Sequence, residues 1–182
     1  MFKKLAKMLL LIFVLAALII TFHKPILKQV YKIEYKNVID TYAHKYNLDE
    51  YLVYALIKKE SRYDPLAVSK KGAVGLMQIM PETGEYIASL IGEESFKESN
   101  LHDAQINIKY GTYYLAKLSK DFHTDVEAIL AAYNGGEGNV RKWMSQNNDE
   151  LDEDKIPFKQ TRDYVKSIKR DYKIYHYLYP SE

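Results

Sequence analysis

The sequence contains no cysteine. This absence excludes a disulfide framework, a metal site built on thiolates and a lipid anchor attached through cysteine. The five histidines, at positions 23, 44, 102, 123 and 176, follow no spacing typical of a metal site. We therefore expect no metal and no other cofactor, and we expect packing alone to stabilise the fold.

Basic residues are not in excess beyond the start of the chain. The first 24 residues hold four of the 26 basic residues and none of the 24 acidic ones. The rest therefore carries a small net negative charge, unlike a surface that binds nucleic acid. We expect no nucleic-acid partner. With 182 residues, 47% of them hydrophobic, the chain is long enough for about one domain with a real core.

One long hydrophobic run is present. It extends from Met8 to Phe22, interrupted only by Thr21, and follows the lysines at positions 3, 4 and 7. Extended back through Leu5, it reaches the ~17 to 20 residues that cross a hydrocarbon core. The lysines place the N-terminus in the cytoplasm. We expect a single-pass signal anchor in the cell membrane, with the rest of the chain on the extracytoplasmic side.

A cleaved signal peptide, followed by secretion, is the alternative. The run ends in residues 18–25 without the small-x-small pattern that a signal peptidase needs. We favour the uncleaved anchor and divide the chain into a cytoplasmic start and transmembrane anchor (1–24), a helical stalk (25–44) and a catalytic domain (45–182).

Helical periodicity dominates the remaining sequence. No internal repeat is present, and no alternating pattern is long enough for an extensive sheet. The class is mostly α. Helices are expected over residues 25–46 (as one or two), 49–60, from 81, 103–122, 125–133, 140–144 and 161–178.

Glu60 is the most informative residue. It lies four residues past Leu56 and three past Ile57, which puts a carboxyl group on the apolar face of the helix at 49–60. Burial and the negative end of the helix dipole both favour its protonated form, so it is a candidate general acid. The alternative is a solvated charged helix end over residues 58–62.

Three further segments follow in order. Residues 60–81 read ESRYDP, then SKKGAVGLMQIMP from position 69; residues 132–136 read AYNGG, and residues 156–165 read IPFKQTRDYV. In this combination, across roughly residues 45–178, the chain resembles the lytic transglycosylases, the SLT-domain enzymes with a goose-type-lysozyme-like fold. The resemblance implies an α-helical, lysozyme-like (SLT) domain with a small loop or β element by the cleft.

The resemblance also implies an activity. Lytic transglycosylases cleave the β-1,4 bond between N-acetylmuramic acid and N-acetylglucosamine in peptidoglycan and form 1,6-anhydromuramic acid ends. Glu60 would act as the single acid and base, while the substrate's own 6-hydroxyl replaces a second carboxylate. The nearest acid, Asp64, precedes a proline, and we interpret it as a turn residue. Ser61 is expected to be a structural partner of the acid.

The segment after Glu60 implies several substrate-binding residues. Ser69 would bond the N-acetyl or 6-hydroxyl region, and Gln78 suits an acetamido group. Gly75 would let the sugar approach closely, and Met80 would pack beneath it.

The later segments imply four more. The Tyr133 ring would wall the cleft, with its hydroxyl reaching the N-acetyl group or Glu60. Asn134 would bind sugar or fix the glycine turn, and Tyr164 would line the cleft. Gln160 departs from the family, which commonly has glutamate there, and this change removes a charge.

Two alternatives remain open. A goose-type-lysozyme-like muramidase would use the same acid and direct a water, and a non-catalytic peptidoglycan-binding scaffold would share the fold. The expected partners are peptidoglycan glycan strands and the membrane. A tethered protein of this kind is also compatible with a place in cell-wall or envelope-spanning machinery.

Overall fold

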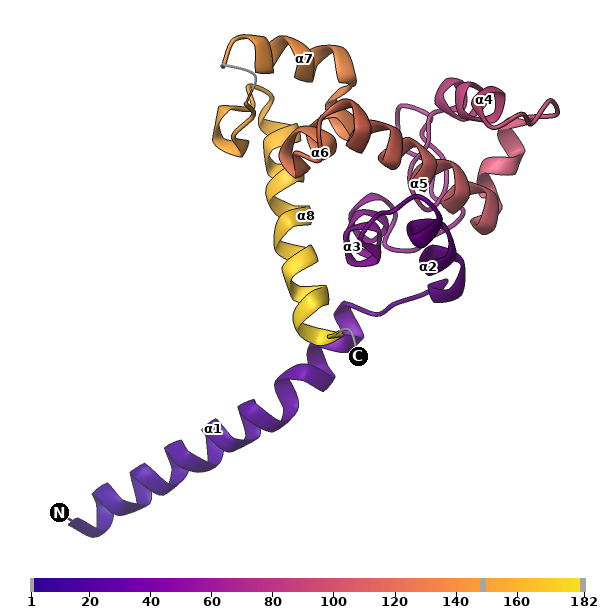
Figure 1. The fold of residues 1–182 in the computed structure, drawn as a ribbon. Coiled ribbons are helices and arrows are strands. Elements are labelled where there is room, and N and C mark those ends of the chain that lie inside the picture. Colours follow the sequence, from indigo (N-terminus) through magenta and orange to yellow (C-terminus); the bar gives the residue numbers. More distant parts are fainter. Residues whose placement is uncertain (1, 148–149, 181–182) are drawn as a thin grey trace.

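Helices form almost all of the regular structure (Figure 1). The computed structural model describes residues 2–147 and 150–180. In this part of the chain the β structure consists of two isolated bridges, Val68 with Val74 and Val74 with Ile79. The mostly α class is therefore confirmed. The helices are α1 (Phe2–Val30), α2 (Lys36–Lys45), α3 (Glu50–Glu60), α4 (Pro81–Leu90), the 3₁₀ helix η1 (Glu98–His102), α5 (Ala104–Asp121), α6 (Val126–Gly135), α7 (Glu137–Ser145), the 3₁₀ helix η2 (Glu153–Lys155) and α8 (Lys159–Leu178).

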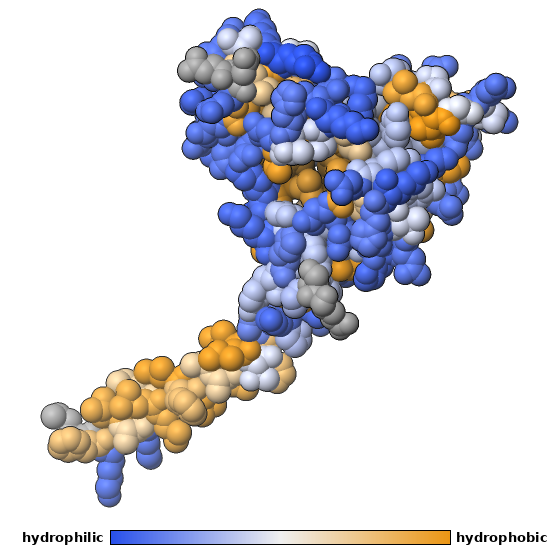
Figure 2. Space-filling model, viewed as in Figure 1, coloured by the Kyte–Doolittle hydropathy of each residue, from blue (hydrophilic) through white to orange (hydrophobic). Residues whose placement is uncertain are grey.

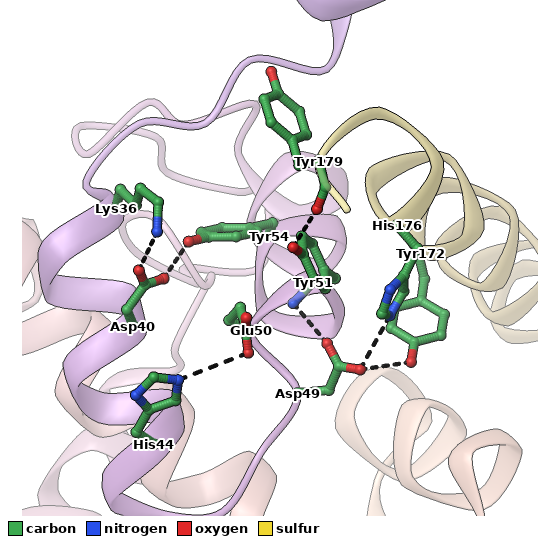
Figure 3. Close-up of polar contacts among 10 residues, drawn as sticks. All are labelled: Lys36, Asp40, His44, Asp49, Glu50, Tyr51, Tyr54, Tyr172, His176 and Tyr179. Carbon is green, nitrogen blue, oxygen red and sulfur yellow. Dashed lines mark hydrogen bonds and ion pairs between the residues drawn. The ribbon is translucent and has the colours of Figure 1, made fainter. Parts of the chain in front are cut away.

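Aspartates begin three of the α-helices. Asp49, Asp103 and Asp125 each accept a hydrogen bond from a backbone N–H in the first turn, at α3, α5 and α6 respectively. Asp49 stands at the start of the helix that the sequence predicted over residues 49–60. It also accepts from Tyr172 of α8 at 2.7 Å, and His176 approaches the same oxygen (Figure 3). The start of α3 is therefore fixed against the last helix.

α3 is the centre of the core. Its residues 51–57 are all buried, and it packs most extensively against α8. The two helices also share a buried ion pair, in which Lys58 Nζ lies 2.7 Å from an oxygen of Asp171. The side chain of Asp171 is only 4% exposed. These contacts determine the direction in which α3 carries Glu60.

α1 extends away from the body (Figure 1). It continues through Pro25 to Val30 and is exposed except at the half-buried His23 and Leu27. Apolar residues cover most of the helix on the face seen in Figure 2. It is the one described helix that is long and apolar enough to cross a membrane, a test that a signal sequence near the N-terminus also passes. Residues 31–35 separate it from α2, so the helical pattern over 25–46 corresponds to two helices. The division into domains stays a prediction.

Asn107 of α5, which is fully buried, holds the loop between α3 and α4 in place. Its amide donates to the carbonyls of Val74 and Leu101, and its oxygen accepts from the N–H of Met77. Gly75 packs against it: a Cβ there would lie 2.3 Å from both Asn107 Nδ2 and the Leu101 oxygen. Gly75 is also at φ +78°. The expectation that this glycine admits the sugar is therefore corrected, because it admits Asn107.

Candidate active site

Glu60 is the last residue of α3, and its carboxyl group opens into a cavity of about 420 Å³. The residue is half-buried. Burial raises the pKa of the carboxyl group to about 7, although a hydrogen bond from Tyr164 and the charge of Lys59 act in the opposite direction. This is the direction expected from its place on the apolar face. The group can therefore hold a proton near neutral pH.

Tyr164 supports the acid from α8. Its hydroxyl donates to Glu60 Oε1, and the residue is 4% exposed. Burial and the nearby Glu60 raise the pKa of the tyrosine well above its usual value, so it stays a donor. The sequence suggested that Tyr164 lines the cleft. In the structure it is absent from the lining of the cavity and lies behind the Glu60 carboxyl group. Its arrangement suits a residue that positions Glu60.

The cavity brings together most of the residues that the sequence indicated. Its lining consists of Glu60, Ser69, Lys70, Lys71, Ala73, Gln78, Met80, Tyr133, Asn134 and Gln160. Glu60 is the only carboxylate in this set. Gly75 and Tyr164 were expected in it and lie elsewhere. Lys70, Lys71 and Ala73 were missed, although they fall inside the motif that starts at Ser69.

Tyr133 forms a wall through its ring. The ring packs against Tyr114 at 5.5 Å between centroids, and the hydroxyl donates to the backbone oxygen of Met77 at 2.8 Å. The hydroxyl therefore bonds the loop and not Glu60. Tyr133 joins α6 to the loop between α3 and α4, which fixes the two sides of the cavity relative to each other.

Three polar side chains of the lining are ordered by backbone contacts or a neighbouring helix. Ser69 Oγ accepts from the N–H of Ala73 at 2.9 Å, so its own proton remains available to a ligand. The amide nitrogen of Gln78 donates to backbone oxygens, which leaves its carbonyl as the accepting group. Asn134 accepts from Thr161 at 3.0 Å and so links α6 to α8. Each polar group is thereby held before any ligand arrives.

Ser61 and Asp64 shape the turn after Glu60. Ser61 donates to the backbone oxygen of Leu76 at 2.8 Å and so ties the loop to α3. The sequence suggested a structural partner of the acid, but the hydrogen bond goes to the loop and not to Glu60. Asp64 accepts from the N–H of Leu66 at 2.9 Å, which agrees with a turn role.

A larger cavity, about 700 Å³, lies at the other end of α3. Its carboxylates have partners: Asp40 accepts from Lys36 and Tyr54, and Glu50 faces His44 (Figure 3). Both carboxyl groups of this cavity are therefore already engaged with neighbouring side chains. Among residues 2–147 and 150–180, no three or more His, Asp or Glu side chains cluster as a metal site would require. We take the Glu60 cavity as the candidate active site.

Sequence comparison finds a match to the family described as "Transglycosylase SLT domain" over residues 37–156. The soluble lytic murein transglycosylase of Escherichia coli K12 is 31% identical over 147 residues, which are 78% of this chain and 23% of that protein. The membrane-bound lytic murein transglycosylase C of Photorhabdus laumondii is 35% identical over 121 residues, 62% of this chain and 34% of that protein.

Solved structures give the same similarity. The 70 kDa soluble lytic transglycosylase of Escherichia coli superposes with a TM-score of 0.80 at 29% identity, covering 85% of this chain and 26% of that one. An inactive glutamate-to-glutamine mutant of lytic transglycosylase Slt from Pseudomonas aeruginosa gives 0.74 at 27% identity, covering 81% and 24%. The chain thus spans about a quarter of the length of these larger relatives.

Proposed function

Because the chain belongs to the transglycosylase SLT family, we propose that it is a peptidoglycan lytic transglycosylase. It would cleave the β-1,4 bond between N-acetylmuramic acid and N-acetylglucosamine and leave 1,6-anhydromuramic acid ends. The observation that carries the proposal is Glu60, which among the described residues is the only carboxylate lining its cavity and has a pKa near neutrality. The inactive mutant of the Pseudomonas relative, in which one glutamate is replaced by glutamine, supports an essential role for a glutamate.

The first step is proton donation. Protonated Glu60 gives its proton to the glycosidic oxygen, the bond from that oxygen to the anomeric carbon breaks, and the N-acetylglucosamine side leaves with a neutral hydroxyl. The carbonyl of the muramic acid's N-acetyl group stabilises the positive anomeric carbon. A pKa of about 7 leaves a substantial fraction of Glu60 protonated near neutral pH and still lets the proton leave.

The second step returns the proton. The Glu60 carboxylate takes it from the 6-hydroxyl of the same muramic acid, and that oxygen attacks the anomeric carbon. The 1,6-anhydro ring closes, no water is consumed, and Glu60 is protonated again. Between the two steps Glu60 is charged, and the Tyr164 hydroxyl is placed to stabilise that charge.

The lining of the cavity favours this reaction over hydrolysis. A glycosidase that uses water needs a second carboxylate as nucleophile or base. At the start of α8, where the family commonly has glutamate, this chain has Gln160, which lines the cavity and carries no charge. The muramidase and the scaffold are therefore secondary candidates.

Mass spectrometry of the muropeptides released from purified peptidoglycan by the full chain tests the proposal. Anhydromuramic ends, lighter by one water than reducing ends, support it. Reducing ends would mean a muramidase, and no release at all would favour a binding or scaffold role.

We expect Tyr164→Phe to change the pH profile as well as the rate. The hydroxyl of Tyr164 lowers the pKa of Glu60, so its removal should raise that pKa further. Since the protonated acid starts the reaction, the alkaline fall of kcat/KM should move to higher pH. The rate itself should drop roughly 10- to 100-fold, the value of a hydrogen bond to a charged group. An alkaline fall of kcat/KM at the same pH as in the wild type, or at a lower pH, would contradict this role.

Lys70 and Lys71 are expected to select substrates that carry peptides. Both are exposed at the cavity, and neither pairs with a carboxylate in the described part of the chain. Peptide stems on muramic acid bear carboxylates. The double variant Lys70→Gln/Lys71→Gln should raise KM for peptide-bearing strands roughly 3- to 10-fold at low salt, since each exposed ion pair contributes little.

Naked glycan strands provide the comparison, because their KM should hardly change in that variant. Lys120→Gln/Lys173→Gln, which changes two exposed lysines outside the cavity lining, is the matched control. An equal effect on naked and peptide-bearing strands would rule out recognition of the stems.

We also propose that α1 anchors the protein in the cell membrane, with the body on the extracytoplasmic side. Its apolar run and the lysines before it support this, as does the relative named as membrane-bound. The intact mass of the protein from the membrane fraction distinguishes this from secretion after cleavage, which would remove the first residues.

A further inference from the structure

The helix that we assign to the membrane continues beyond its apolar run. After Phe22, α1 extends from His23 to Val30, and this extension contacts the end of α8 (Figure 1). The His23 ring stacks on Tyr177 at 5.9 Å, and Lys24 Nζ lies 4.6 Å from the centre of the same ring. The body therefore begins to contact α1 at the first residue after the run.

One turn further along α1 the contact repeats. Lys28 Nζ lies 4.6 Å from the ring centre of Tyr179, whose hydroxyl donates to the backbone oxygen of Tyr31 at 3.0 Å. We call His23, Lys24, Lys28, Tyr177 and Tyr179 the α1–α8 seam. Lysine and tyrosine suit a membrane–water interface, because each combines an apolar stem or ring with a polar end.

Tyr31 closes the junction. It is 8% exposed, and its hydroxyl donates to the buried Asp171 at 3.2 Å. Lys58 lies over its ring at 4.2 Å, and the Tyr175 ring meets it edge-on. The residue that follows α1 is thus held between α3 and α8, so anchor and body are joined by packed contacts and not by a flexible tether.

The length of α8 gives the distance from this junction to the acid. Tyr177 contacts the start of the α1 extension, and Tyr164 bonds Glu60. Both lie in one continuous helix, thirteen residues apart. At 1.5 Å per residue this is about 20 Å. Because any tilt of α8 would shorten the vertical component, this value is close to the greatest height of Glu60 above the point where α1 leaves the apolar layer.

We propose that the α1–α8 seam is a rigid spacer that holds the catalytic cleft about 20 Å or less above the bilayer, so that the substrate is glycan anchored in, or lying against, the same membrane. This inference rests on the proposed transglycosylase function and on the membrane assignment of α1. A fixed, short reach raises the local concentration of such strands and excludes glycan held further away.

Two substrates test the reach with the full chain in phospholipid vesicles. One is glycan polymerised from lipid-linked precursors and still anchored in the same vesicles; the other is intact sacculi added in suspension. We expect the anchored strands to be cut more than about tenfold faster. In detergent, where no bilayer orients the protein, that preference should disappear. Equal rates of cutting of anchored strands and sacculi in vesicles, or a preference for the anchored strands that persists in detergent, would overturn the proposal.

An insertion tests the seam itself. A flexible segment of about 20 Gly and Ser residues between Lys24 and Pro25 would add roughly 25 Å of reach. We expect it to increase cutting of sacculi from vesicles at least threefold and to leave the rates in detergent unchanged. The same segment inserted after the exposed Gly92, where a side chain would meet no neighbour, is the control. No difference between the two insertions would contradict a spacer role.

The height can be measured independently of activity. Because the chain has no cysteine, Glu82→Cys, on an exposed position two residues past Met80, gives a single labelling site near the cleft. Energy transfer from this label to headgroup dyes should report one narrow range of distances, which the insertion after Lys24 broadens. A broad range in the unmodified chain would refute the rigid spacer. Absence of cutting on both substrates, in vesicles and in detergent, would instead refute the proposed function and leave this measurement valid.

Discussion

Glu60→Gln is expected to reduce the release of muropeptides by at least roughly 10³-fold, because glutamine neither donates nor accepts the proton in either step. No other carboxylate of residues 2–147 and 150–180 lines the cavity, so none of these groups can replace the acid. The amide keeps the size of the side chain and can still meet the Tyr164 hydroxyl. The initial rate of product formation measures the effect, and activity within tenfold of the wild type would exclude Glu60 as the catalytic acid.

The same substitution should not destabilise the fold. The pKa of Glu60 is about 7 when folded against 4.5 for an ordinary glutamate, so its contribution to the free energy of unfolding is intact below pH 4.5 and declines as the pH rises through 7. At pH 8 the charged carboxylate would cost at most roughly 3 kcal/mol, which the amide avoids. In urea unfolding, the wild type and Glu60→Gln should be equally stable at pH 4, and the variant should be the more stable of the two at pH 8. A less stable variant at pH 8 would mean that lost activity reflects lost structure.

Asp171→Ala is expected to cause the largest loss of stability, about 3–5 kcal/mol, because it leaves a buried charge without its partner. Asp171 accepts from Lys58 and Tyr31, so its removal affects both α3 and the end of α1. The free energy of unfolding from urea denaturation gives the value. If the loss is below about 1 kcal/mol, water has replaced the carboxylate and the ion pair is not a structural element.

Two variants provide the controls for this prediction. Asp163→Ala removes an exposed carboxylate from the same helix, where it pairs with Lys159, and should hardly change the stability. Lys58→Met combined with Asp171→Leu removes both buried charges and should recover at least half of the loss, since an apolar pair of similar size often replaces a buried ion pair without cost.

The sequence predicted those parts of the fold that depend on local pattern. The apolar spacing of residues 49–60 placed Glu60 on the buried side of α3, and Asp49 marked the beginning of that helix correctly. The motifs predicted most of the cavity, because residues 69–80 form one loop against α6. The likeness to solved lytic transglycosylases also confirms the predicted lysozyme-like SLT fold.

The remaining features depend on residues that are far apart in the chain. The bond between Tyr164 and Glu60 joins positions 104 residues apart, and Asp171 reaches Lys58 across 113. No local period encodes such contacts. The role of Gly75 was wrong for a similar reason, since its neighbour, Asn107, comes from α5. In the sequence, Lys70 and Lys71 look like two ordinary solvated lysines. Only the fold shows that they line the same cavity as Glu60.

The acid and the hydroxyl that supports it come from α3 and from α8, which are neighbours in space but 104 residues apart in the sequence. A ribosome releases the chain from its N-terminus, so Glu60 emerges long before Tyr164 is made. The cleft is complete only when the last helix has been synthesised and has docked on α3. A cleft built from these two helices is therefore incomplete throughout the synthesis of the residues before α8, and the order of synthesis itself delays its activity until the last helix has folded against α3.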